Sequence, residues 1–182
     1  MYAFLRTIGV RPTAGLVGAV SFQFNGFFVG WMCFPTMRSV AAWLPLMLIG
    51  VEQAARTGRG RWLLLTSIGT GLQFLAGHLH ASLYVLMIFG AYTVLRLAAL
   101  VWPQAGVAPG DLSLAAQSSR ASANDASSAW ARVRSALGLG VLILGAVALG
   151  TMLASAQLAP VIEMTRLSSR TEGVSYQALV GN

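Results

Sequence analysis

The chain has 182 residues, of which 56% are hydrophobic and 9% are charged, and its mean hydropathy is +0.69. Because a soluble domain usually carries about 25% charged residues, this composition excludes an ordinary soluble fold and predicts a protein of the lipid bilayer. The net charge of +7 comes from arginines scattered in short clusters between apolar segments, which is typical of topology signals; we expect no nucleic-acid partner. The single Cys33 excludes an internal disulfide. We expect neither a metal ion nor a cofactor.

The apolar segments predict an all-α fold, a polytopic integral membrane bundle of about five transmembrane helices. A span needs about 20 mostly apolar residues, with a usable range of about 17 to 25. The expected order is a cytoplasmic segment 1–12, a membrane domain 13–102 with spans 13–30, 39–54, 62–77 and 79–100, a flexible cytoplasmic loop 103–132, a fifth span 133–159 and an extracytoplasmic, truncated segment 160–182. Residues 62–95 form, as an alternative, a re-entrant hairpin with both ends in the cytoplasm.

Arginine placement predicts the orientation, because short cytoplasmic connections keep Lys and Arg whereas translocated ones lose them. One set of connections holds Arg6, Arg11, Arg56, Arg59, Arg61, Arg96, Arg120, Arg132 and Arg134. The other set holds Arg38, Arg166 and Arg170. This alternation predicts that the N-terminus lies in the cytoplasm and the C-terminus outside. Arg96 falls within the fourth span near its cytoplasmic end, where its long stem can reach the headgroups.

Polar residues gather at three places, most of them toward the predicted outer face. In the first, Ser21 and Asn25 are spaced i and i+4 and share a helix face, and Arg38 follows in the first outer loop. Hydrogen bonding between spans is the simpler interpretation of the first two residues.

The second place is the segment around His78 and His80. Gln73, Gly77, His80 and Tyr84 form one stripe of a continuous helix, whereas His78 points elsewhere. Both histidines can therefore face one ligand only if the helix breaks at Gly77. Two histidines without a nearby Cys, Asp or Glu make an incomplete metal site, so donation to a phosphate or a sugar hydroxyl fits them better. The alternative is that they cap helix ends in contact with water.

The third place follows the fifth span. Glu163, Arg166 and Arg170 lie on one face of a helix that Pro160 can begin. A guanidinium pair binds phosphate in bidentate fashion, which suits a phosphorylated lipid. The alternative is a surface salt bridge between Glu163 and Arg166.

Three motifs resemble the YfhO family of bacterial membrane proteins, and their order and spacing match over about residues 2–177. The motifs are Ala41-Ala-Trp-Leu-Pro-Leu-Met-Leu48 with Glu52, Leu72-Gln-Phe-Leu-Ala-Gly-His78 with Ala81-Ser-Leu-Tyr84, and Ala154-Ser-Ala-Gln-Leu-Ala-Pro160 with Glu163 and Ser168-Ser-Arg170. The resemblance implies a multi-pass protein of the bacterial cytoplasmic membrane, related to the GT-C glycosyltransferases. These enzymes transfer a sugar from a polyprenyl-phosphate donor to an acceptor outside that membrane.

We therefore expect part of a membrane glycosyltransferase-like protein that acts on a cell-envelope acceptor. In GT-C enzymes the catalytic acid usually lies in the first outer loop, whereas residues 31–38 contain no Asp or Glu, so we expect a fragment that is inactive alone. The expected donor-binding residues are Arg38, His78, His80, Arg166 and Arg170, with Glu163 as general base. The alternatives are a transporter or flippase-like component for a lipid-linked substrate and a non-catalytic membrane assembly subunit.

Overall fold

The computed structural model describes residues 1–102 and 122–167, and all regular structure in these residues is helical. The elements are α1 (Tyr2–Thr7), α2 (Pro12–Gln23), α3 (Gly26–Gly30), α4 (Pro35–Ala42), α5 (Leu44–Thr57), the 3₁₀-helix η1 (Gly60–Trp62), α6 (Leu63–Leu75), α7 (Leu79–Val101), α8 (Ser122–Leu153) and α9 (Ser155–Leu167). The predicted all-α class is confirmed for this part of the chain. Arg120, Arg170 and most of the predicted loop lie outside the described residues.

Among residues 1–102 and 122–167, two helices are long and apolar enough to cross a membrane, namely α7 with 23 residues and the part of α8 from Trp130 to Leu153 with 24. The predicted span 79–100 is one continuous helix. The predicted span 13–30 is instead divided, because the Asn25 side chain caps α3 by accepting a hydrogen bond from the Phe28 N–H at 3.0 Å. The span 39–54 is divided at Trp43, two residues before Pro45, which cannot donate to a helical turn.

The bounds of the fifth span differ most from the prediction. Residues 122–132, predicted as part of a flexible loop, already belong to α8. The predicted span 133–159 also contains a break, since α8 ends at Leu153 and α9 begins at Ser155. Pro160 lies inside α9, so the expectation that it begins a helix is wrong.

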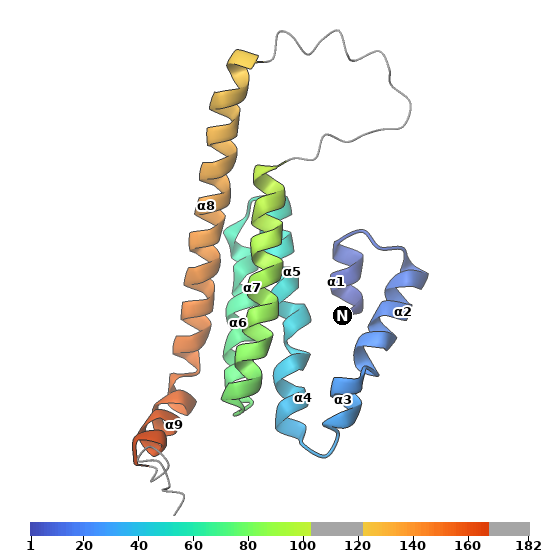
Figure 1. Cartoon of the computed structure of the whole chain (residues 1–182), viewed down its shortest axis with the longest axis vertical. Helices are drawn as coiled ribbons and strands as arrows, with labels where there is room; N and C mark the ends of the chain where they lie inside the picture. The colour runs from blue at the N-terminus through green and yellow to red at the C-terminus, as the bar shows by residue number, and fades with distance from the viewer. Residues whose placement is uncertain (103–121, 168–182) are drawn as a thin grey trace, which may run out of the picture.

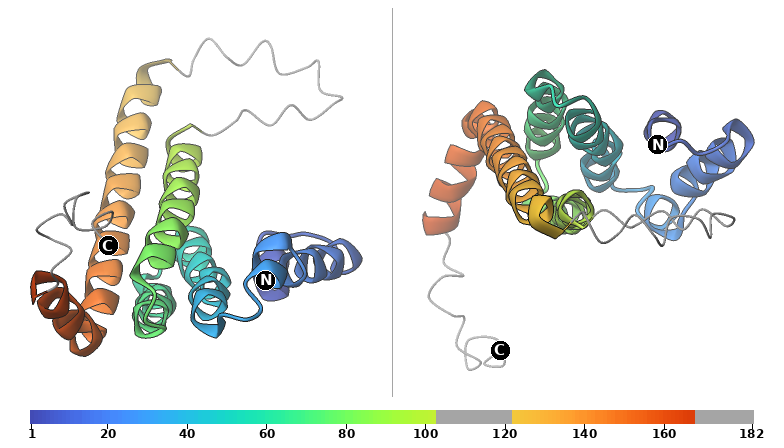
Figure 2. Two further views of the ribbon diagram at one scale, coloured as in Figure 1. Left: turned by 60° about the horizontal axis from the view of Figure 1, so that its bottom comes forward. Right: turned by 90° about the horizontal axis from the view of Figure 1, so that it is seen from above.

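The helices α5, α6, α7 and α8 form an up-and-down bundle (Figure 1). In it, α6 packs between α5 and α8, and α7 contacts α5 and α8 as well. The small helix α1 packs against α5 and joins α2 to one side of the bundle, as the view from above shows (Figure 2). The α5–α6 connection, the end of α7 and the start of α8 share one end of the bundle. We call it the arginine-rich end after Arg56, Arg59, Arg61, Arg96 and Arg132. The α3–α4 and α6–α7 turns and α9 share the other, which we call the histidine end after His78 and His80.

Small residues set the close approach of these helices. A Cβ atom added at Gly69 would lie 2.6 Å from Cγ of Met47 in α5, and one added at Gly150 would lie 2.7 Å from Cβ of Thr70 and still closer to the Ser67 carbonyl oxygen in α6. Small side chains at such crossings are typical of helices packed within membranes, because they let the backbones approach closely.

An apolar core that includes Val40, Met47 and Val51 is buried, as in a soluble protein, but polar side chains are buried beside it and large apolar side chains also cover the outer faces of the long helices. Buried polar or charged side chains are Glu52, Thr66, Ser67, Thr70, Gln73, Ser82 and Thr93. Large apolar side chains such as Met87, Leu95 and Leu144 are about seven-tenths exposed, at 70%, 70% and 71%. Only 17% of the apolar window in α7 and 22% of that in α8 are buried, whereas the core helix of a soluble protein buries its apolar residues.

Replacement of Gly150 by leucine tests the α6–α8 contact. We expect Gly150→Leu to lower the free energy of unfolding by at least about 1–3 kcal/mol, because the side chain must displace the α6 backbone. Gly145→Leu is the matched control in the same helix, since an added Cβ there meets no atom within 4 Å. Thermal unfolding of both purified variants in detergent, followed by circular dichroism, measures the difference. Equal stabilities would contradict the observed crossing.

Candidate functional site

The histidine end begins with a sharp turn between α6 and α7. Gly77 has φ +78°, a left-handed conformation that glycine adopts without strain. The helix is therefore broken at Gly77, which is the condition for both histidines to face one ligand. His78 is the N-cap residue of α7 and is half-buried, whereas His80 lies in the first turn and is exposed.

The contacts of the predicted stripe divide at the same turn. Tyr84 Oη lies 2.9 Å from Nε2 of His80, and their rings meet edge to face with centroids 4.8 Å apart. Gln73, on the other side of the turn, is fully buried and donates Nε2 to the Ser82 carbonyl at 3.0 Å. Its Oε1 atom is buried without a hydrogen-bond partner in the described structure. Thus His80 and Tyr84 are neighbours as predicted, and Gln73 instead ties α6 to α7.

The structure brings α4 and α9 to this end as well. Arg38 lies in α4, which packs on α6 and α7, and its buried Nε has no partner among the described residues. Gln157 of α9 places Nε2 3.7 Å from where a Cβ on Gly77 would lie. The cavity between Gly77 and Gln157 has a volume of about 20 Å³, which is no larger than a water molecule. It is too small for a ligand of sugar-phosphate size.

The remaining predicted site residues are placed only in part. Glu163 is exposed on α9. Arg166 belongs to the same helix, but its side chain lies outside the described structure, as does all of Arg170. The predicted pairing of Glu163 with Arg166 therefore stays a prediction.

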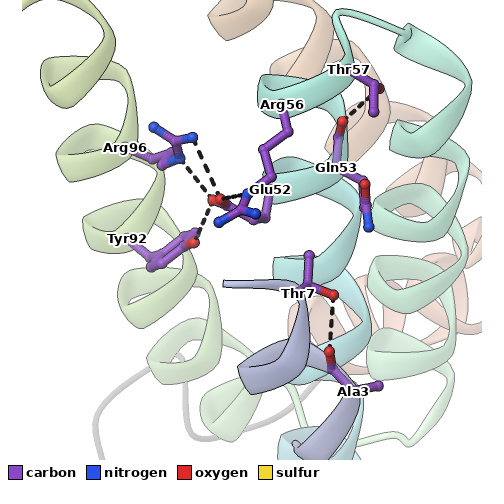
Figure 3. A network of polar contacts seen from close by, with 8 residues as sticks. All are labelled: Ala3, Thr7, Glu52, Gln53, Arg56, Thr57, Tyr92 and Arg96. Atoms are coloured by element: carbon purple, nitrogen blue, oxygen red, sulfur yellow. Dashed lines mark hydrogen bonds and ion pairs between the residues drawn. The ribbon is translucent and has the colours of Figure 1, made fainter. Parts of the chain in front are cut away.

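A second polar cluster, which sequence reasoning missed, joins α5 to α7. The side chain of Glu52 is only 3% exposed, and Oε1 accepts from Nε of Arg56 at 2.6 Å. Oε2 accepts from Nε of Arg96 at 2.7 Å and from Oη of Tyr92 at 2.9 Å. Nη2 of Arg96 completes the set at 3.4 Å from Oε1. Figure 3 shows Tyr92 and Arg96 pointing from one helix to the same carboxylate.

Each oxygen of Glu52 thus accepts two hydrogen bonds, which fills its acceptor capacity. A carboxylate in this state holds its neighbours in place and has no free lone pair for a metal ion or a substrate proton. The expectation that Arg96 extends to the lipid headgroups is corrected, because its guanidinium turns inward and its side chain is 25% exposed. The i, i+4 spacing of Glu52 with Arg56, and of Tyr92 with Arg96, was the available signal.

Comparisons with known proteins add no relative, since no protein-family model, no curated protein and no solved structure matches this chain. The resemblance to the YfhO family therefore rests on the three motifs alone. Their residues fall at both ends of the bundle: Glu52 near the arginine-rich end, and His78 and Glu163 at the histidine end. In the described part of the chain, no three His, Cys, Asp or Glu residues gather as metal ligands do.

The Glu52 cluster has a direct test. We expect Glu52→Gln to lower the free energy of unfolding by about 3 kcal/mol, because it leaves the Arg56 and Arg96 guanidiniums facing each other without a counter-charge. The double variant Glu52→Gln with Arg96→Gln should recover part of this loss. Glu163→Gln is the control, since that carboxylate is exposed. Denaturant unfolding in detergent gives the four values. A free energy of unfolding that is the same in Glu52→Gln as in the wild type would show that the cluster contributes nothing to stability.

Proposed function

We propose that this chain is a multi-pass protein of a bacterial cytoplasmic membrane. The exposed apolar faces of α7 and α8 support this, because outward-facing leucine, valine and methionine side chains on helices long enough to cross a membrane are favourable in lipid. Hydrogen bonds inside the bundle satisfy its buried hydroxyls. Thr70, for example, donates to the Thr66 carbonyl at 2.8 Å, as is required where no water is present.

The proposed orientation places the arginine-rich end in the cytoplasm. The histidine end then lies outside. The N-terminus, which the arginine pattern assigns to the inside, lies beside the middle of the bundle (Figure 1). The shorter helices cross by pairing end to end, as α4 does with α5, and by tilting within the bundle. This retains the five predicted crossings with different helix bounds.

We further propose that the histidine end binds the phosphate of a polyprenyl-linked sugar, as part of a GT-C-like glycosyltransferase that acts on an envelope acceptor. The observation that carries this proposal is the break at Gly77. It puts the two histidines at an open end beside α4, which supplies Arg38 with an unpartnered Nε. Arg38 also forms no ion pair with a carboxylate of the described residues, and such an arginine suits a phosphate ligand.

Within this proposal Glu163 is the general base, because it is an exposed carboxylate on α9. Glu52 cannot serve, since its oxygens are saturated and lie near the opposite end of the bundle. Arg166 and Arg170 would complete the donor site from the helix that carries Glu163 and the residues beyond it. The motif resemblance, rather than any contact, connects this arrangement to sugar transfer.

The native Cys33 tests the orientation without any substitution. It is exposed between α3 and α4, so a membrane-impermeant maleimide should label it in intact cells. A cysteine introduced by Arg59→Cys in a Cys33→Ser background, on the α5–α6 connection, should react only after the membrane is permeabilised. The reverse pattern would overturn the orientation, and labelling of both in intact cells would refute crossing between them.

Arg38 tests the donor site. A charge-assisted hydrogen bond contributes about 1.5–3 kcal/mol, so Arg38→Gln should weaken binding of a polyprenyl-phosphate hexose at least about tenfold. Arg59→Gln removes the same charge at the other end and should leave affinity within about twofold. Titration of the labelled donor lipid into the full chain in detergent measures both. Equal affinities for the two variants would remove Arg38 from the site.

A further inference from the structure

A cavity of about 580 Å³ lies at the arginine-rich end, where α5, α7 and α8 converge. Its volume falls in the range of cavities that hold small molecules. Apolar and small side chains line most of it, including Leu100 of α7 and Leu139 and Leu142 of α8. It lies at the opposite end of the bundle from the proposed donor site.

Arg132 is the charged residue in the lining of this cavity. Its Nε atom is buried and has no hydrogen-bond partner among the described residues. A buried donor left unpaired is costly, so such a group in a native structure indicates a missing acceptor. The guanidinium fork matches the oxygens of a phosphate.

The described surroundings add positive charge. Gly58 and Gly60 line the cavity on either side of Arg59, with Arg61 directly after them. Glu52 of α5, the helix that also carries the lining residues Ala54 and Ala55, already accepts hydrogen bonds from Arg56, Tyr92 and Arg96. Among the residues that the structure describes at this end, Arg132 therefore has no carboxylate partner, and an external anion can supply the acceptor.

We propose that this cavity binds an anionic phospholipid, with Arg132 holding the phosphate and the leucines contacting the apolar part of the molecule. The combination of one cation with apolar walls favours a lipid over a free phosphate ion, and basic pockets between helices at the cytoplasmic face are suited to anionic headgroups. The proposal rests on membrane insertion but is independent of donor binding at the histidine end.

Two pairs of variants test it. Arg132→Gln is matched by Arg134→Gln, which removes an equal charge from an exposed position two residues further on. Gly138→Leu fills the cavity, and an added Cβ at Gly138 meets no atom within 4 Å, so the fold is spared. Gly145→Leu is its control, since Gly145 is equally unobstructed and lies outside the cavity lining.

The measurement is native mass spectrometry of the full chain from detergent, with phosphatidylglycerol, phosphatidylcholine or inorganic phosphate added. We expect phosphatidylglycerol to bind, and Arg132→Gln and Gly138→Leu each to weaken it at least about tenfold, with both controls within about twofold. Wild-type binding by Arg132→Gln and Gly138→Leu would overturn the proposal. Displacement of the lipid by inorganic phosphate at similar concentration would overturn its lipid part. Cys33 labelling reports membrane insertion separately, so a chain that fails to insert can be distinguished from an inserted chain that fails to bind phosphatidylglycerol.

Discussion

The carboxylate of Glu52 fixes how the bundle is assembled, because a buried charge must be surrounded by donors. Arg96 and Tyr92 reach it from successive turns of α7, which sets the register of α7 against α5. The ring of Tyr92 is in turn met edge to face by Phe4 at 5.6 Å, which places α1 against the same pair of helices. A misregistered pairing would leave charges unpaired in an apolar setting, at a cost of several kcal/mol. One acidic group thus specifies the relative position of three helices.

Neutral hydrogen bonds and close glycine crossings also hold the helices in position. Thr66, which is fully buried, donates across the helix interface to the Met47 carbonyl at 3.1 Å. That bond is possible because Gly50 and Gly69 bring α5 and α6 so close that neither position has room for a Cβ. Gly150 allows the same approach of α8 to α6. Specificity therefore comes from a few polar bonds at close crossings, while apolar side chains fill the rest of the core and also cover the outer faces of α7 and α8.

The sequence predicted what depends on composition and local backbone. The all-α class, the long apolar helix at 79–100 and the turn at Gly77 follow from apolar length and from glycine. The division at Asn25 was missed because a hydropathy window does not register a cap that satisfies the broken turn locally. The partner of Arg96 was missed for a different reason. Glu52 lies 44 positions away, and only the folding of α5 against α7 brings the two together.

The two ends differ in how firmly their charges are held. At the arginine-rich end, Glu52 holds the guanidiniums of Arg56 and Arg96 in fixed geometry. Such an end suits an anion that stays bound as part of the structure. At the histidine end, His80 is exposed, and its ring meets that of Tyr84 one turn further along α7. In the proposed function, the anionic substrate, which must leave after reaction, binds at this end, where His80 is exposed rather than held by a buried carboxylate.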